Sequence, residues 1–137
     1  MSTLYLETSS VLAWLLGQPR GDEVRAAVDG AATVVTSALT AVQSERALVR
    51  AQTLGLLKEG DAVRLRGILG RAGTEWMCMA VCGEVLARAA RPFPVEPVRT
   101  LGAIHLATAL EFTKAFPDLR LLSLDQRIAD NAIALGV

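Results

Sequence analysis

Short runs of strand-forming apolar residues alternate along the chain with longer segments in which apolar residues recur every three or four positions. The first pattern is typical of β-strands and the second of amphipathic helices. Glycine and proline mark several ends, as Gly17 and Pro19 do after the first helix and Gly70 and Gly73 after the fourth. The expected strands are residues 4–6, 33–36, 74–79 and 119–122, and the expected helices are residues 8–16, 21–28, 38–52, 58–69, 81–90, 98–114 and 125–135.

This alternation predicts the fold class. Strands separated by helices indicate a parallel sheet with right-handed crossovers and helices on both faces. The 137 residues contain no repeat and no long linker, so we expect one domain over residues 1–137. Hydrophobic residues make up 52% and aromatic residues 4%, which predicts a core of Ala, Val, Leu and Ile. The apolar surplus also indicates a surface that a partner covers.

Charge and targeting signals narrow the function. Lys plus Arg and Asp plus Glu number 14 each, so the net charge is zero and RNA binding would need a local basic patch. The start lacks a basic segment followed by an apolar stretch, and no apolar run approaches transmembrane length. We therefore expect a soluble, cytoplasmic protein that does not bind a membrane.

Several common sites are excluded because their motifs are missing. The sequence has no G-x-x-x-x-G-K-[ST] loop, no G-x-G-x-x-G after a strand and no G-x-S-x-G elbow. Cys78 and Cys82 are too few for a structural zinc site, so we expect small buried hydrophobes, with a redox or metal role as the alternative. The lone His105 is expected to have hydrogen-bond partners in a helix rather than a metal.

Glu7 ends the first expected strand, and Thr8 and Ser9 lead from it into a helix. One interpretation is an acid of the first helical turn, with Thr8 or Ser9 as the N-cap. The other is a functional carboxylate, because open α/β sheets place their chemistry at the carboxyl ends of strands.

Two further acids favour the functional interpretation. Glu45 lies in the helix after the second strand, and Asp125 follows the fourth strand. In a parallel sheet these elements meet near one edge, so the three acids would converge. Carboxylate oxygens select hard cations such as Mg²⁺ or Mn²⁺, which activate water for attack at phosphorus. Without an ion the carboxylates would repel one another, so separate structural roles remain the alternative.

Four stretches resemble, in the same order, the motifs of PIN-domain ribonucleases, and most of all those of VapC-type toxins of bacterial toxin–antitoxin pairs. The first has a strand that ends in an acid followed by hydroxyl residues, and in the second the Glu of the family corresponds to Glu45. The stretches are residues 4–12, 37–48, 99–109 and 121–137, of which the third is the most specific match. The resemblance implies a three-layer α/β/α fold with a parallel sheet of four to five strands.

The resemblance also implies an activity and its residues. The expected protein is a Mg²⁺- or Mn²⁺-dependent endoribonuclease, a hydrolase of RNA phosphodiester bonds, in which Glu7, Glu45 and Asp125 are both the catalytic residues and the metal ligands. Candidate contacts to RNA phosphates are Arg46, Arg99 and Arg127, and candidate hydroxyl ligands are Thr8, Ser9 and Ser123.

Partners follow from the same resemblance. It implies the toxin component of a type II toxin–antitoxin system, which forms a homodimer and binds a cognate antitoxin protein. The helices expected at residues 21–28 and 58–69 could form a groove for an amphipathic antitoxin helix.

The sequence departs from the family pattern at two positions. Glu7 is one methylene longer than the expected Asp, and Gly102 stands where the pattern has an acid. Glu96 and Asp130 are candidate substitutes, although neither occupies that position. A missing ligand weakens a metal site. The alternative function is therefore a catalytically inactive PIN-fold protein that acts by binding RNA or an antitoxin.

Overall fold

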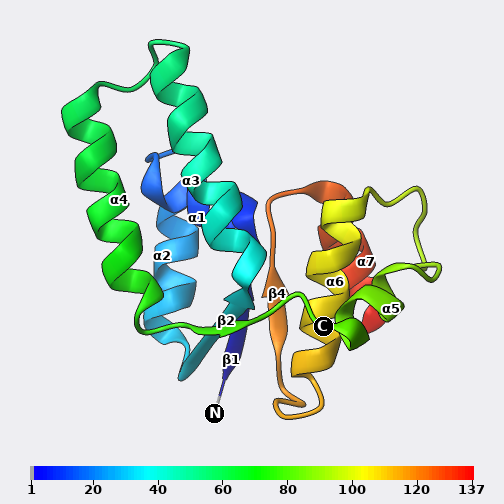
Figure 1. Cartoon of the computed structure of the whole chain (residues 1–137). Helices are drawn as coiled ribbons and strands as arrows, with labels where there is room; N and C mark the ends of the chain where they lie inside the picture. Colours follow the sequence, from blue (N-terminus) through cyan, green and yellow to red (C-terminus); the bar gives the residue numbers. More distant parts are fainter. Residues whose placement is uncertain (1) are drawn as a thin grey trace.

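The computed structural model describes residues 2–137, which contain four strands and seven helices (Figure 1). The strands are β1 (Thr3–Leu6), β2 (Thr33–Ser37), β3 (Met77–Met79) and β4 (Arg120–Leu122). The helices are α1 (Thr8–Leu15), α2 (Gly21–Gly30), α3 (Ala38–Thr53), α4 (Glu59–Gly73), α5 (Gly83–Ala89), α6 (Thr100–Phe112) and α7 (Gln126–Leu135).

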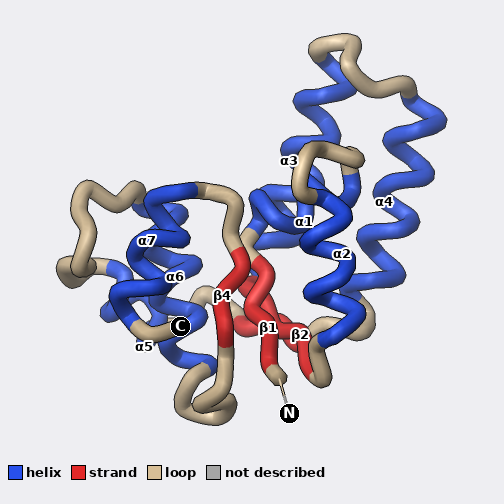
Figure 2. The backbone as a smooth tube through the Cα atoms, turned by 180° about the vertical axis from the view of Figure 1, so that it is seen from behind, coloured by secondary structure: helices blue, strands red, loops and turns tan. Residues whose placement is uncertain are grey.

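All four strands are parallel and lie in the order β3-β2-β1-β4. Helices α1 to α4 lie on one side of the sheet and α5 to α7 on the other, and Figure 2 shows the same layers from behind. This arrangement confirms the predicted three-layer α/β/α fold. The chain adds β2 and β3 on one side of β1 and then returns to place β4 on the other. Such a switch point opens a crevice at the carboxyl ends of the two strands that flank it.

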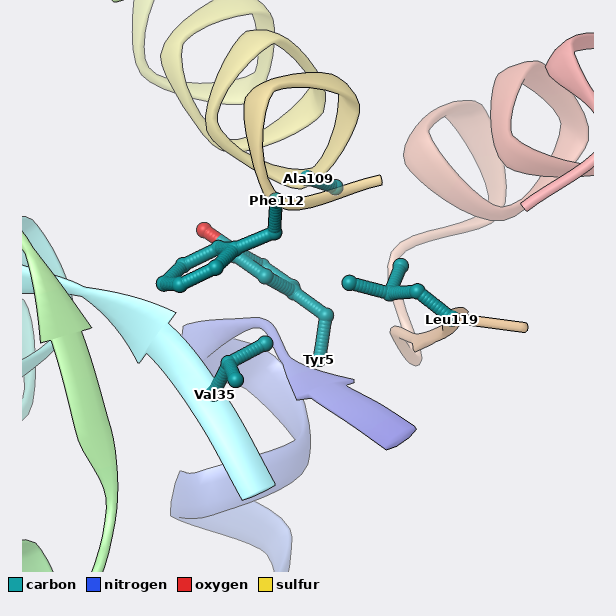
Figure 3. Close-up of a cluster of buried hydrophobic side chains, with 5 residues drawn as sticks. All are labelled: Tyr5, Val35, Ala109, Phe112 and Leu119. Atoms are coloured by element: carbon teal, nitrogen blue, oxygen red, sulfur yellow. The ribbon is translucent and has the colours of Figure 1, made fainter. Parts of the chain in front are cut away.

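The period-two alternation of strand residues divides the core between the two faces of the sheet. Tyr5 and Val35 point to the α6 face, where they pack with Ala109, Phe112 and Leu119 (Figure 3). The residues on the other face of β1 include Leu6, which packs against buried side chains of α1, α2 and α4, namely Val11, Leu15, Val24 and Leu69.

Several element boundaries differ from those expected by one or two residues, and those of α4 and β3 differ by more. Helix α4 continues past Gly70 to Gly73, so the roughly 1 kcal/mol cost of an internal glycine does not end it. Strand β3 begins only at Met77, since the preceding Trp76 leaves the sheet and packs on Trp14, with ring centroids 6.2 Å apart.

The cysteines are not the buried hydrophobes that we expected. Cys78 is exposed and Cys82 is only half-buried. Cys78 lies in β3, which forms one edge of the sheet, so a single neighbouring strand covers it. Across residues 2–137, none of the helices has the length and apolar character needed to span a membrane.

Candidate active site

A pocket of about 500 Å³ opens at the carboxyl ends of β1 and β4, where the strand order reverses. Side chains from α3, α6 and α7 contribute to it, together with the loop before α6 and the residues that cap α1 and α7. They are Glu7, Gln43, Pro97, Val98, Arg99, Leu101, Gly102, His105, Asp125, Arg127 and Ile128.

Glu7 is the N-cap of α1 and is only 5% exposed. Its Oε2 accepts a hydrogen bond from the backbone N–H of Ser9 at 3.1 Å. Its Oε1 accepts from the hydroxyl groups of Ser9 at 2.5 Å and Ser123 at 2.6 Å. The interpretation with Thr8 or Ser9 as the cap is therefore wrong about the residue, because Glu7 itself fills that position. Its carboxylate is fixed by three donors, two from Ser9 in the first turn of α1 and one from Ser123 after β4.

Asp125 is the N-cap of α7 and reaches the pocket from the end of β4. Its Oδ1 accepts hydrogen bonds from the backbone N–H groups of Arg127 and Ile128 at 3.0 and 3.2 Å. Its Oδ2 accepts none from residues 2–137, and the side chain is exposed. The structure thus brings together Glu7 and Asp125, which the sequence separates by more than a hundred positions.

Glu45 does not join them, so the expected convergence of three acids is wrong. Successive residues of a helix are rotated by about 100°, so Gln43 and Glu45 lie on opposite flanks of α3, on either side of buried Ser44. Gln43 faces the pocket, whereas Glu45 forms an ion pair with Arg66 of α4 at 3.0 Å. The pocket therefore receives an amide from α3, and not the carboxylate predicted there.

Gln43 belongs to a hydrogen-bonded network at the floor of the pocket. Its Oε1 lies 2.7 Å from Nε2 of His105 and 2.5 Å from the hydroxyl of Thr8. Because an amide oxygen only accepts, Nε2 carries the proton, and Nδ1 of His105 accepts from the hydroxyl of Tyr5 at 2.8 Å. The expectation that His105 has hydrogen-bond partners is confirmed.

Burial sets the charge state of this network. It lowers the pKa of His105 below its ordinary value, and the nearby charge of Glu7 opposes that shift without reversing it. Burial, assisted by the charge of Glu7, raises the pKa of Tyr5. Both directions favour the neutral forms that the hydrogen bonds require.

Gly102 lies one helical turn before His105 on the pocket side of α6. A Cβ atom at this position would lie 3.3 Å from Cγ1 and 3.5 Å from Cδ1 of Ile128. Ile128 is itself buried in the core between α6 and α7. The volume that a side chain at position 102 would need is thus partly filled.

The candidate substitutes for a missing acid do not reach the pocket. Glu96 accepts hydrogen bonds from the backbone of Phe93 and Val98 within its own loop. Asp130 accepts from the amide of Gln126 on the outside of α7. Among the residues that the structure describes, no three acidic, histidine or cysteine side chains form a group that could hold a metal ion.

Two of the three candidate arginines line the pocket. Arg99 precedes α6, and Arg127 lies in the first turn of α7, where its guanidinium donates to the carbonyl of Glu96 at 3.3 Å. Arg46 instead lines a separate apolar groove along α3. The pocket rim therefore carries two cations beside two carboxylates, although the whole chain is neutral.

Comparisons with known proteins agree with this architecture. The family model for the PIN domain matches residues 4–134. Ribonuclease VapC46 of Mycobacterium tuberculosis is 33% identical over 138 residues, which cover 100% of this chain and 95% of that protein. The crystal structure of M. tuberculosis VapC20, described as a Sarcin-Ricin loop cleaving toxin, matches with a TM-score of 0.63 and 16% identity. That match covers 97% of this chain and 95% of VapC20, and it shows a common fold.

Proposed function

This chain belongs to the PIN domain family, and on that premise we propose that it is an endoribonuclease and the toxin component of a toxin–antitoxin pair. The observation that carries the proposal is the meeting of Glu7 and Asp125 in one pocket at the switch point of the sheet. The whole-length similarity to a protein named as a VapC ribonuclease supports it.

The pocket offers two carboxylates, a small set of protein ligands that can hold a divalent cation. Mg²⁺ is often held by one or two carboxylates, while water and substrate phosphates complete its coordination. Glu7 and the free Oδ2 of Asp125 would hold the ion, Mg²⁺ or Mn²⁺. When bound, the ion supplies Lewis acidity that activates water and stabilises charge at phosphorus. Because Glu7 already accepts three hydrogen bonds, we expect a weak ion site without RNA.

The other residues of the pocket position RNA. Arg99 and Arg127 would hold backbone phosphates, since guanidinium groups pair well with phosphate oxygens. Both ring nitrogens of His105 are hydrogen-bonded, one to Tyr5 and the other to Gln43, so this neutral side chain fixes the floor of the pocket. Binding through a few phosphates will weaken as salt concentration rises.

The test compares RNA cleavage by the purified chain, by Asp125→Asn and by Glu45→Gln, each with Mn²⁺ or Mg²⁺. Glu45→Gln is the matched control, because this acid lies outside the pocket. We expect cleavage by the wild type and by Glu45→Gln, and loss of cleavage in Asp125→Asn. Cleavage that depends on Glu45 would place the reaction elsewhere.

A second candidate function rests on Gln43 and Gly102, which give the pocket neutral groups on α3 and α6. Under this alternative the chain binds RNA or an antitoxin without cleaving RNA. Salt-dependent RNA binding by a wild type that cleaves no RNA at saturating Mn²⁺ would favour it. Cleavage that Asp125→Asn abolishes would exclude it.

The antitoxin is proposed to bind a groove between α2 and α4. This groove, of about 590 Å³, contains apolar side chains flanked by charged ones, namely Trp14, Arg25, Val28, Asp29, Ile68, Arg71, Ala72, Glu75 and Trp76. An apolar floor with charged edges suits an amphipathic helix. Val28→Glu should weaken the complex with the antitoxin, whereas Val63→Glu, on an exposed position of α4, should not.

A homodimer and a cytoplasmic location are also part of this proposal. Three exposed apolar residues, Val42, Leu54 and Leu101, line one groove beside α3 that a second copy could cover. Sedimentation velocity is the direct test, and a monomer at micromolar concentration would contradict the dimer.

A further inference from the structure

We propose that this pocket contains a latent divalent-cation site that the neutral side chain of Gln43 keeps weak, and that Gln43→Glu alone strengthens it. The inference rests on the proposed function only in assuming that Glu7 and Asp125 face a common ion. It concerns ion binding without RNA, so it is measured independently of cleavage.

The contacts of Gln43 are those that a carboxylate would make. Both hydrogen bonds that hold its side chain end on Oε1, which accepts from His105 and from Thr8. Its amide nitrogen donates to no acceptor within residues 2–137. Glutamate has nearly the same shape, so Gln43→Glu would keep both hydrogen bonds and replace the unused –NH₂ group with an oxygen. That oxygen would join the carboxylates of Glu7 and Asp125 along the wall of one pocket.

Gly102 offers a second position on the same pocket, but the structure resists a side chain there. A Cβ at position 102 would lie 3.3 Å from Cγ1 of Ile128, closer than an ordinary van der Waals contact. Ile128 is buried beside Leu106 and Ala132, so it can move only by disturbing the core between α6 and α7. Gly102→Asp should therefore recover less ion binding than Gln43→Glu, and removing the Ile128 side chain should improve it.

The ligand set explains why one acid matters. Mg²⁺ and Mn²⁺ prefer oxygen ligands, and carboxylates add charge that neutral amides lack. Loss of a group that merely supports a ligand costs about 10–100-fold in metal affinity, so gain of a ligand should improve affinity at least about 10-fold.

The experiment is titration of Mn²⁺ into RNA-free protein by isothermal calorimetry, with electron paramagnetic resonance of free Mn²⁺ as the second readout. The variants are wild type, Gln43→Glu, Gly102→Asp, Glu45→Gln and the pair Gln43→Glu with Asp125→Asn. We expect Gln43→Glu to bind Mn²⁺ at least about 10-fold more tightly than wild type, with Gly102→Asp in between. Glu45→Gln should equal wild type, and Asp125→Asn should remove the gain.

Three results would overturn the proposal. One is a folded Gln43→Glu variant that binds Mn²⁺ no more tightly than wild type. Another is a gain that Asp125→Asn leaves intact, and the third is a larger gain in Gly102→Asp than in Gln43→Glu. If Gln43→Glu does not fold, Gly102→Asp combined with Ile128→Ala decides, because it adds an acid while removing the crowding atoms. Absence of a gain in that folded variant would equally refute the latent site. None of these results depends on whether the wild type cleaves RNA.

Discussion

Replacing Glu7 by alanine should destabilise the protein far more than replacing Glu45, which lies in the middle of α3. Glu7 is 5% exposed and accepts hydrogen bonds from the Ser9 backbone and from the hydroxyl groups of Ser9 and Ser123. Glu45 pairs only with Arg66, and their side chains are 45% and 35% exposed. The comparison therefore separates a buried structural carboxylate from a surface ion pair.

The magnitude follows from what each alanine leaves behind. Loss of an N-cap costs about 0.5–2 kcal/mol. A buried donor that loses its acceptor costs about 1–3 kcal/mol, which applies to the Ser123 hydroxyl. Relief from burying the charge of Glu7 offsets part of this, so we expect about 2–4 kcal/mol for Glu7→Ala. An exposed pair contributes about 0–1 kcal/mol, which limits the cost of Glu45→Ala.

Urea unfolding, followed by the fluorescence of Trp14 and Trp76, measures both free energies of unfolding. These two tryptophans are half-buried, and they pack on each other against the core cluster of α1, α2 and α4. The expected result is a large shift in midpoint for Glu7→Ala at an unchanged m-value, and little shift for Glu45→Ala. Equal destabilisation by the two substitutions would refute the reasoning, because it would mean that Glu7 is no better fixed than a surface acid.

Three other predictions concern separate parts of the chain. Gly21→Ala should cost about 1–3 kcal/mol because its Cβ would lie 2.5 Å from the backbone oxygen of Ala13, whereas Gly30→Ala, which meets no atom within 4 Å, should cost little in the same unfolding assay. Burial lowers the pKa of His105 below 6.5, so its contribution to stability is present above pH 6.5 and is lost as pH falls below that value. Between pH 7 and 5, the free energy of unfolding of the wild type should fall by up to about 1.4 kcal/mol per pH unit more than that of His105→Asn. Parallel plots of the two unfolding free energies against pH would contradict this. Arg99→Ala should lower the slope of log RNA affinity against log salt concentration by about one, as expected for the loss of one phosphate contact. An unchanged slope would show that Arg99 does not contact RNA phosphate.

Much of the fold followed from the sequence because the pattern and the packing agree. The alternation of strands and helices predicted the parallel sheet, and Ser37 caps α3 as expected by accepting from the N–H of Leu39. The structure at the β3 edge of the sheet is harder to predict from the sequence. The composition of residues 74–79 indicates a strand, but only tertiary contacts show that Trp76 packs on Trp14 and that Cys78 lies exposed at the edge.

The sequence predicts the pocket residues that follow strand ends. It does not predict which residue of α3 faces the pocket, because that depends on how the helix is rotated about its axis. Glu7 and Asp125 follow β1 and β4, so the sheet alone brings them together. The charge of Glu45 and its position in the helix after β2 predict a pocket residue, whereas the face of α3 that meets the pocket depends on which residues the helix buries. Those residues are Thr40, Ser44 and Leu48, spaced four apart, and they leave positions 43 and 45 on opposite flanks. The buried stripe is visible in the sequence, but its small polar members hide which flank meets the pocket.

The same geometry gives the main polar side chains of the pocket hydrogen-bond partners within the protein. Glu7 is satisfied by serine donors, Asp125 by the first N–H groups of α7, and His105 by Tyr5 and Gln43. Three carboxylates in this space would require a cation to offset their repulsion. Gln43 brings an amide from α3 and Gly102 brings no side chain from α6, so only Glu7 and Asp125 bring carboxylates to this pocket. An ion held by two carboxylates needs further oxygen ligands, which RNA phosphates or an added carboxylate would supply. Position 43 on the flank of α3 is therefore where a substitution should change ion affinity most.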